Sequence, residues 1–498
     1  MDIMEMLSSL EDLENRLFAL RHALGVLNLD GVTAAPKGSS RPREKTVGIL
    51  AGEEYRLRCG EGTRRLLEEM EEASPRLPAR ARRQVHELMR DFTRTSCIPM
   101  AEYTEYARTV SIGSDVWHES KEKSDFASFL PWLEKIVETG RRFALYRDSG
   151  SDPYDTVLDG YEKGLSRSQL DPFFALLRER LVPLIRAIGE KPAPPAVRGF
   201  YPVEDQKRLT EYLMDLLGLD RQRCAAAETE HPFTDAFSRW DVRITTHYHT
   251  EDMLLSLYSV VHEGGHALYE SGIGEDLQFT CLGRGSSMSI HESQSRFYEN
   301  IIGRSEAFIR RIFPVLSELF PGEMRSRFPE DVYRAANLVT PSLIRTQADE
   351  VTYPLHVMVR YDLEKALFDG DLRCADLPGA WSELYRKYLG VAPSCDREGV
   401  LQDSHWSGGM LGYFPSYALG SAYAAQMFET MKKTVDVEGA VSSGDLSPVT
   451  SWLRERIHIY GRMLDPKELL LNAFDGAPFD PECYVRYLTD KYSALYGL

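Results

Sequence analysis

The sequence predicts a mainly α protein that contains one small antiparallel sheet. Along most of its 498 residues, apolar side chains recur at intervals of three and four, which is the pattern of an amphipathic helix. The clearest such segments are residues 4–27, 126–146, 170–188, 254–268, 353–368 and 381–389. Residues 240–247 instead alternate apolar and polar side chains, as a half-exposed strand does. We therefore expect a helical body with its sheet directly before the helix at 254–268.

Breaks in the helical pattern separate the predicted helices. Breaks rich in Gly, Pro and Ser fall at residues 35–43, 191–202, 272–289 and 475–481. Hydrophobic residues make up 43% and charged residues 27% of the chain, as in ordinary globular proteins with a large core. The sequence contains no internal repeat that would divide it, so we expect residues 1–498 to form a single helical unit.

The charge balance and the cysteines narrow the possible partners and the compartment. With 76 acidic and 59 basic residues, the formal charge of -17 would repel a polyanion, so nucleic acid is a poor partner. The seven cysteines are scattered and never form a Cys-X-X-Cys pair, which fits a reducing cytoplasm. The N-terminus does not resemble a signal peptide, and no apolar run reaches membrane-spanning length. We therefore expect a cytoplasmic protein without a membrane partner.

The helix predicted after the strand carries a metal-binding pattern. Thr250 can cap this helix, and acidic residues follow in its first turn. Further along, residues 262–266 read His-Glu-Gly-Gly-His. On a helix, the spacing between His262 and His266 places both imidazoles on one face, where they can bind one metal ion.

The residues between the two histidines, Glu263, Gly264 and Gly265, also fit an active site. Glu263 lies beside the first ligand, where a carboxylate can take a proton from the attacking water and pass it to a leaving amine. Gly264 and Gly265 would each destabilise an ordinary helix by about 1 kcal/mol relative to Ala. Their presence indicates that a substrate or a partner segment approaches the helix closely at this point.

A third metal ligand is expected further along the chain, because catalytic zinc sites commonly combine three protein ligands with one open position. Glu292 is the candidate, since it lies in a segment that follows a Gly/Ser-rich loop and looks helical. His291 and Glu299 are rival ligands. One turn after Glu292, where a carboxylate often orients a ligand histidine, the chain has Arg296, and Asp349 is a candidate for that orienting role.

Five other short motifs accompany the 262–266 motif, which by itself is a common pattern, so it is the combination of all six that is specific. The other five are residues 231–233 (His-Pro-Phe), 241–245 (Asp-Val-Arg-Ile-Thr), 291–294 (His-Glu-Ser-Gln), 344–349 (Ile-Arg-Thr-Gln-Ala-Asp) and 399–406 (Gly-Val-Leu-Gln-Asp-Ser-His-Trp). Together the six motifs resemble those of the thermostable metallocarboxypeptidases of the carboxypeptidase Taq family, and the resemblance covers nearly the whole chain. The chain departs from the family pattern at Leu29, where Trp is often found, and at His247, where Arg is frequent.

This resemblance implies a two-lobed helical body with a deep central groove, with the catalytic motifs concentrated in residues 231–417. It also implies a carboxypeptidase that removes single residues from peptide C-termini, usually as a homodimer. The implied cofactor is one divalent ion per subunit, Zn²⁺ or sometimes Co²⁺ or another divalent metal. The matched positions give His262, His266 and Glu292 as its ligands and Glu263 as the catalytic base.

A carboxypeptidase must recognise a free α-carboxylate, for which a planar guanidinium with two parallel donors is suited. Arg345 is the first candidate because it lies in one of the family motifs, and Arg243 could join or replace it. Either arginine could instead form a structural ion pair. Arg360 and Arg296 are weaker candidates. His231 could ligate the metal, bind a substrate carbonyl or close a turn before Pro232, and its place in a family motif favours the contact with substrate.

The oxyanion of the tetrahedral intermediate needs hydrogen-bond donors besides the metal. A Gly-rich stretch near the end of the motif region supplies an imidazole and two phenols, from His405, Tyr413 and Tyr417. Related helical peptidases with the same metal motif use a His and a Tyr at similar spacing, which favours His405 and Tyr417. Buried tyrosines are also often simple core residues.

The sequence therefore predicts a metallocarboxypeptidase that releases single C-terminal amino acids from peptides by metal-assisted attack of water. The closest alternative is an endo-acting oligopeptidase on the same scaffold. A non-catalytic helical binding protein is a second alternative, which the presence of all three ligands and the base disfavours.

Overall fold

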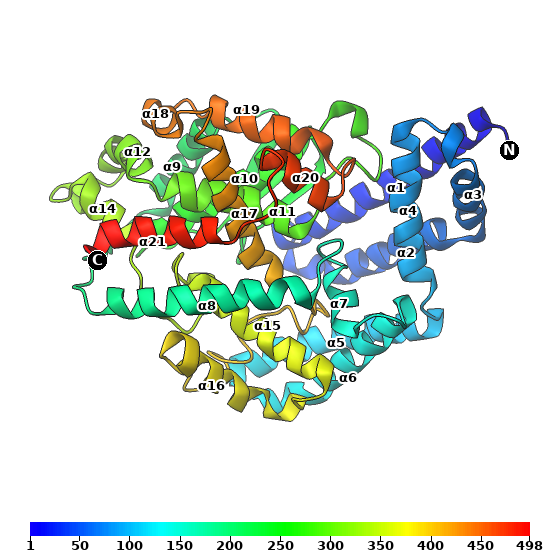
Figure 1. Ribbon diagram of the computed structural model, residues 1–498, viewed down its shortest axis with the longest axis horizontal. Coiled ribbons are helices and arrows are strands. Elements are labelled where there is room, and N and C mark those ends of the chain that lie inside the picture. The colour runs from blue at the N-terminus through cyan, green and yellow to red at the C-terminus, as the bar shows by residue number, and fades with distance from the viewer.

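The structure is a computed structural model. Helices make up most of the chain, and Figure 1 shows them gathered into an upper and a lower group. The structure describes residues 1–498, except for the side chain of Lys37. The helices of the first half are α1 (Ile3–Val32), α2 (Ser40–Cys59), α3 (Glu61–Glu72), α4 (Ala79–Ser96), α5 (Met100–Lys123), α6 (Phe126–Arg147), α7 (Pro153–Leu158), α8 (Arg167–Gly189) and α9 (Val203–Leu216).

The second half continues in the same manner. Its helices are α10 (Met253–Gly272), α11 (Met288–Arg296), α12 (Glu306–Leu319), α13 (Pro321–Met324), α14 (Pro329–Ala336), α15 (Tyr353–Asp369), α16 (Leu377–Leu389), α17 (Pro415–Met431), α18 (Val437–Ser443), α19 (Ser447–Arg456), α20 (Pro466–Ala473) and α21 (Glu482–Tyr496). Each of the six helical segments predicted from the sequence falls inside one of the observed helices. The mainly α prediction is therefore confirmed.

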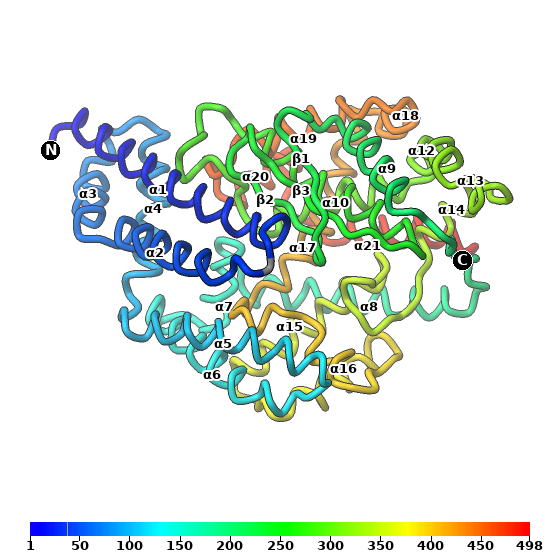
Figure 2. Tube along the Cα trace, turned by 180° about the vertical axis from the view of Figure 1, so that it is seen from behind, coloured from blue at the N-terminus to red at the C-terminus, as the bar shows by residue number. Residues whose placement is uncertain are grey.

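The two groups of helices form the two lobes that were expected. In Figures 1 and 2, α5, α6, α15 and α16 lie in the lower lobe, while α9, α10, α12 and α17 to α21 lie in the upper lobe. One large apolar core spans both lobes, from Phe126 to Tyr496. The N-terminal helices α1, α3 and α4 lie at one end and share a smaller apolar cluster with the loop after α10.

The predicted sheet is present, but it is mixed rather than antiparallel. It consists of β1 (Cys224–Glu228), β2 (Thr234–Ser238) and β3 (Asp241–Thr246), in the order β1-β3-β2. β2 pairs antiparallel with β3, whereas β1 pairs parallel with it. A short turn joins β2 to β3, so these two strands run in opposite directions, and β1, which also runs opposite to β2, is therefore parallel to β3.

The helix that carries the metal motif begins next to this sheet. Its N-cap is Asp252, whose side chain accepts a 3.1 Å hydrogen bond from the Leu254 backbone, so the cap predicted at Thr250 lies two residues later. Most of α10 is buried between β2, β3, α9 and α11. In the part of the chain described here, no helix has the length and apolar character that crossing a membrane requires.

Candidate active site

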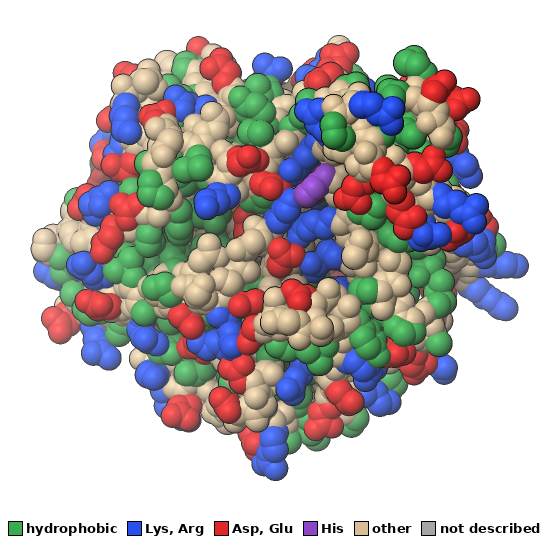
Figure 3. Space-filling model, turned by 45° about the vertical axis from the view of Figure 1, so that its right-hand side comes forward, with side chains coloured by type: hydrophobic (Ala, Val, Ile, Leu, Met, Phe, Trp, Pro, Cys, Tyr) green, Lys and Arg blue, Asp and Glu red, His purple; other side chains and the backbone are tan. Residues whose placement is uncertain are grey.

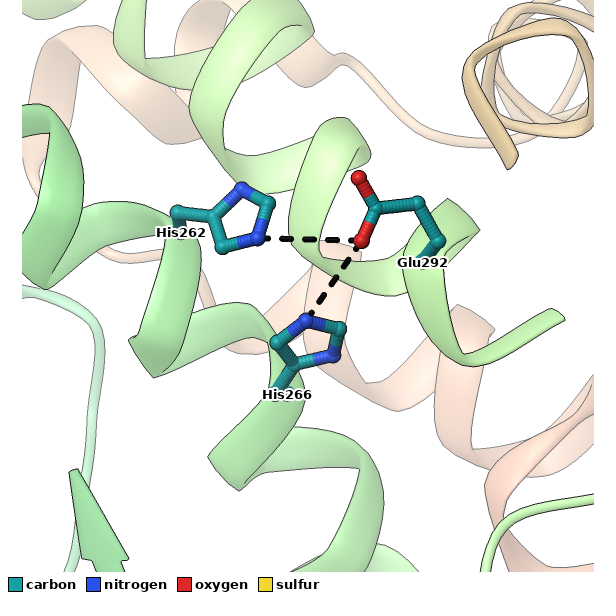
Figure 4. Close-up of side chains that lie close together, drawn as sticks. All are labelled: His262, His266 and Glu292. Carbon is teal, nitrogen blue, oxygen red and sulfur yellow. Dashed lines mark ion pairs between the residues drawn. The ribbon is translucent and has the colours of Figure 1, made fainter. Parts of the chain in front are cut away.

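Three side chains that the sequence analysis selected as metal ligands come together from two helices. His262 and His266 lie on α10 and Glu292 lies on α11, and Figure 4 shows all three pointing toward one another. Oε2 of Glu292 lies 3.7 Å from Nε2 of His262 and 3.6 Å from Nε2 of His266. One ligand atom from each residue lies within 4.8 Å of the other two.

These three donor atoms fit a divalent metal ion. Zinc ligands lie about 2.1 Å from the metal, so two ligands at corners of a tetrahedron are about 3.4 Å apart, close to the separations from Glu292 to the histidines. Burial lowers the pKa of His262, but the charges of Glu292 and Glu299 outweigh burial and leave that pKa raised. The same negative charges favour a metal cation.

Close packing of helices at two glycines brings the ligands together. A β-carbon at Gly265 would lie 2.6 Å from the carbonyl oxygen of Gln294 and 2.7 Å from Cα of Ser295, both in α11. A β-carbon at Gly420, on α17, would lie 2.6 Å from Cγ of Glu292. The close approach predicted at residue 265 is therefore made by α11, and α17 packs against the carboxylate ligand itself.

Glu299, a rival ligand in the sequence analysis, orients His262 instead. Its Oε2 atom accepts a 2.8 Å hydrogen bond from Nδ1 of His262, which leaves Nε2 free to face the metal. Arg296 donates to Glu292 at 2.7 Å and to Glu299 at 3.1 Å. Burial raises the pKa of Glu299, but Arg296, His262 and Arg304 outweigh burial and hold it far below its ordinary value. Glu299 is therefore charged.

His291, the other rival ligand, orients His266 in a similar way. The Nδ1 atoms of the two rings are 2.6 Å apart, and Nε2 of His291 lies 2.8 Å from a carboxylate oxygen of Glu270. With Nε2 of His266 facing the metal, its Nδ1–H donates to His291, whose Nε2–H donates to Glu270. Burial and the neighbouring His291 hold the pKa of His266 well below its ordinary value, so its imidazole is neutral, as metal binding requires.

Asp349 does not orient a ligand histidine, and that prediction was wrong. Its carboxylate accepts hydrogen bonds from the backbone of Thr340, Val351 and Thr352 and from the hydroxyl of Thr352. These four nearby donors occupy the carboxylate, which closes the turn before α15.

Glu263 lies beside the ligands and is held by a strand residue that the sequence analysis missed. Oγ1 of Thr234, on β2, lies 2.7 Å from Oε2 of Glu263 and 3.0 Å from its backbone oxygen. Burial raises the pKa of Glu263, while His262 and Thr234 lower it, and the effect of burial is the larger. The resulting raised pKa suits a general base. The only signal in the sequence was that Thr234 directly follows the 231–233 motif.

The ligands and Glu263 line a cavity of about 970 Å³. Its walls come from α1, α4, β2, α10 and the segment 278–292, together with Tyr413 and Tyr417. Figure 3 shows a hollow in this side of the molecule, with a histidine and several Lys and Arg side chains beside it. A cavity of this size can hold part of a peptide next to the metal site.

The predicted cluster of His405, Tyr413 and Tyr417 is assembled at one wall of the cavity. Nε2 of His405 is 3.0 Å from the Tyr417 hydroxyl, and the two tyrosine rings pack edge to face with centroids 5.1 Å apart. Both tyrosines line the cavity, whereas His405 lies behind Tyr417. Burial and the charge of Arg345 lower the pKa of His405 to about 3, so this imidazole is neutral.

Arg345, the first candidate for binding a substrate carboxylate, is buried and already paired. Its guanidinium donates to Asp403 at 2.9 and 3.0 Å and to the Tyr353 hydroxyl at 3.0 Å. Arg360 donates to the same aspartate at 2.7 Å. The alternative left open above for Arg345, a structural ion pair, describes its contacts in this structure, and Arg360 shares the same aspartate.

Arg243 and His231 also lie outside the cavity wall. Arg243, on β3, donates to Asp241 at 2.6 and 2.9 Å and stacks on Phe237. His231 is exposed in the loop between β1 and β2. The next residue, Pro232, is the first residue of this loop that lines the cavity. Of the four substrate-binding residues predicted, the structure brings only Tyr413 to the cavity.

Comparison with known proteins agrees with this geometry. Residues 9–492 match the family model described as carboxypeptidase Taq (M32) metallopeptidase. Carboxypeptidase 1 of Bacillus subtilis (strain 168) is 38% identical over 491 residues, which are 98% of each chain. Thermostable carboxypeptidase 1 of Pyrococcus furiosus is 37% identical over 486 residues, which are 96% of each chain.

Solved structures give the same result. The M32 carboxypeptidase of Deinococcus radiodurans R1 superposes with a TM-score of 0.96 at 34% identity, covering 99% of this chain and 100% of the other. A structure of Pyrococcus furiosus carboxypeptidase superposes with a TM-score of 0.95 at 37% identity, covering 98% and 99%. These matches favour neither the endo-acting oligopeptidase nor the non-catalytic binding protein. The chain is a metallocarboxypeptidase and belongs to the carboxypeptidase Taq (M32) family.

Proposed function

We propose that this metallocarboxypeptidase is zinc-dependent, with His262, His266 and Glu292 holding one ion per subunit and Glu263 acting as general base. The observation that carries the proposal is the meeting of two imidazole nitrogens and one carboxylate oxygen within 4.8 Å at the wall of a cavity. Imidazole and carboxylate donors suit Zn²⁺ in a catalytic site. Co²⁺ suits the same donors and is the second candidate.

In this proposal Glu263 carries the proton through the reaction. When bound, the metal ion polarises the scissile carbonyl and lowers the pKa of water. Glu263 takes a proton from the attacking water and gives it to the leaving amine. Thr234 supports this role because its hydroxyl is 2.7 Å from the carboxylate of Glu263.

Tyr417 and His405 stabilise the oxyanion in the same proposal. Burial raises the pKa of Tyr417 well above its ordinary value, so the phenol keeps its proton for donation. Nε2–H of His405 can donate to the phenol oxygen, which orients the hydroxyl toward the cavity. Tyr413 packs beside Tyr417 and contacts substrate.

The proposed substrate is a peptide with a free C-terminus. Arg345 remains a candidate for its carboxylate, since its guanidinium lies 4.7 Å from the ring centroid of the cavity residue Tyr417. Arg243 and His231 remain predictions as substrate contacts. A homodimeric state, a cytoplasmic location and the lack of nucleic-acid and membrane partners also remain predictions.

Substitution of Glu263 by Gln tests the assignment of the base. Gln keeps the shape of the side chain but cannot take the proton, so kcat should fall by about 100-fold to 10,000-fold. Zinc content, measured by elemental analysis, should equal that of the wild type. Glu318→Gln, at an exposed position on α12, is the matched control and should keep full activity. Near-normal turnover of Glu263→Gln would contradict the assignment.

A further inference from the structure

Arg284 presents a guanidinium to the cavity of the metal site without a carboxylate partner. It lies in the loop between α10 and α11, is exposed to solvent, and lines the same cavity as His262 and His266. Arg284 forms no ion pair with any acidic residue that the structure describes. Glu270 and Asp91 act on it only by longer-range electrostatic attraction. This arginine is therefore available to a negatively charged ligand.

The other cationic side chains of this cavity wall differ from Arg284, since most of them are paired with acidic residues. Arg21 pairs with Glu54 at 2.9 Å, Arg83 and Lys163 each pair with Asp465 at 2.7 Å, and Arg90 pairs with Asp159 at 2.9 Å. Arg462 donates from Nε to the backbone oxygen of Gly285 at 3.0 Å. Positive charge that is not neutralised is thus concentrated at Arg284 and Arg462.

The backbone on both sides of Arg284 is held in place. The carbonyl of Leu282 accepts a 3.1 Å hydrogen bond from the backbone of Arg462, and the Gly285 backbone donates to Glu270 at 3.0 Å. Glu270 lies on α10 and also accepts from His291, the partner of the ligand His266. The loop that carries Arg284 is therefore fixed to the helix that carries the metal ligands, which a specific contact to substrate requires.

The electrostatic surroundings of Arg284 favour a bound anion. Although part of its side chain reaches solvent, the protein around Arg284 removes much of the water from its guanidinium, which, together with the charges of Arg462 and Arg21, lowers the pKa of Arg284 to about 10. An anion in the cavity would offset this repulsion between cations. A carboxylate suits the site best among peptide groups, because it can accept two parallel hydrogen bonds from one guanidinium.

We propose that Arg284 binds a carboxylate of the peptide substrate and so contributes to substrate selection. This proposal rests on the proposed function of the metal site. The carboxylate can be the α-carboxylate of the C-terminal residue or the side chain of an acidic residue near the scissile bond. Arg345 and Arg243, the candidates considered above, each donate to an aspartate, whereas Arg284 has no acidic partner and can make this contact without breaking an ion pair.

Arg284→Gln and Arg284→Lys test this proposal on the full-length, zinc-loaded protein. The control is Arg373→Gln, whose side chain is exposed and lies outside the cavity wall. KM and kcat are measured for N-acetylated Ala-Ala, Ala-Glu and Glu-Ala. The dissociation constant of N-acetyl-Ala-Glu from the zinc-free protein, measured by calorimetry, gives a readout that does not depend on turnover.

For Arg284→Gln we expect KM to rise about tenfold or more with little change in kcat, because a binding contact is lost. A rise for all three peptides identifies the α-carboxylate, and a rise for an acidic peptide alone identifies the side chain. Arg284→Lys should lie between the wild type and Arg284→Gln. If Arg284→Gln and Arg373→Gln match the wild type in both KM and dissociation constant, the proposal is wrong. If instead the wild type hydrolyses none of the peptides, the proposed function fails, and calorimetry still tests Arg284.

Discussion

The hydroxyl of Thr234 lies between two acceptors of one residue, the carboxylate and the backbone oxygen of Glu263. A hydroxyl has one proton, so it donates to the carboxylate while Glu263 is ionised, and it can turn to the backbone oxygen when Glu263 carries a proton. The contact therefore holds Glu263 in both states that a general base passes through.

Thr234→Val removes this hydroxyl while keeping the shape of the side chain. We expect kcat to fall about tenfold or more with little change in KM, since a hydrogen bond to a charged group contributes about 1.5–3 kcal/mol. Thr234→Ser keeps the hydroxyl and should restore most of the activity. Zinc content and melting temperature report on the fold, and equal kcat for the Val and Ser variants would argue against the positioning role.

At the residue scale, the sequence predicted contacts along one helix but not contacts between helices. The spacing of His262 and His266 follows from helical geometry alone, and Glu292 could be selected by its chemical type. The hydrogen bond between His262 and Glu299 joins residues 37 positions apart, and it depends on how α10 packs against the segment that follows α11. Asp349 was misassigned because its local backbone donors could not be seen in the sequence.

At the scale of elements, the close packing of α10 on α11 depends more on Gly265 than on its neighbour Gly264. A β-carbon at Gly265 would meet backbone atoms of α11, which cannot move aside. A β-carbon at Gly264 would lie 2.5 Å from Cδ1 of Leu217, the flexible end of a side chain. The two neighbouring glycines thus provide a matched pair.

Gly265→Ala should separate the two helices and weaken the metal site. We expect a loss of stability of about 1–3 kcal/mol, from overpacking, together with a lower affinity for zinc. Gly264→Ala should affect both quantities less. Chemical unfolding and competition with a zinc chelator measure the two effects, and an equal zinc affinity in both variants would contradict this account of the packing.

Glu364, on α15, is hydrogen-bonded to residues from distant segments of the chain. It accepts hydrogen bonds from the Tyr154 hydroxyl, the Trp406 indole and the Gly412 backbone at 2.7–2.8 Å. Burial raises the pKa of Glu364 from 4.5 to about 7 despite these donors. The unfolded chain therefore loses this proton at lower pH than the folded protein does.

The contribution of Glu364 to stability should fall as pH rises from about 4.5 to 7, by up to about 3 kcal/mol, and stay constant above that range. Glu364→Gln should lack this pH dependence, whereas Glu383→Gln, at an exposed position on α16, should keep it. Melting temperatures at a fixed scan rate between pH 5 and 8 measure the difference. Identical pH profiles for the wild type and Glu364→Gln would show that the carboxyl does not titrate in this way.

Periodicity located the helices well because it reports which face is buried, as the agreement of residues 254–268 with α10 illustrates. It could not predict the direction of β1, whose sequence is short and rich in alanine. It also could not predict that α11 continues into a π-helical segment, Phe297–Gly303, which carries Glu299. Such a widened turn depends on packing within the fold.

At the scale of the whole molecule, the cavity joins parts of the chain that are far apart in sequence. Phe18 and His22 on α1 line it, as do Tyr413 and Tyr417 some 400 residues later. The sequence motifs pointed to the segments that carry His262, Glu292 and Tyr417, but they did not indicate that the N-terminal helices close one side of the cavity. That arrangement depends on the smaller apolar cluster between α1, α3, α4 and the loop after α10.

We propose that this protein uses a metal ion held by His262, His266 and Glu292 to hydrolyse peptides from the C-terminal end. The most direct test follows one peptide and its C-terminal amide by mass spectrometry, with the zinc-loaded protein and after removal of zinc by a chelator. We expect a ladder of products shortened one residue at a time from the free acid, no cleavage of the amide, and no products without zinc. Cleavage of the amide at an internal bond would contradict the carboxypeptidase activity, and an unchanged ladder after complete removal of the metal would contradict its dependence on metal.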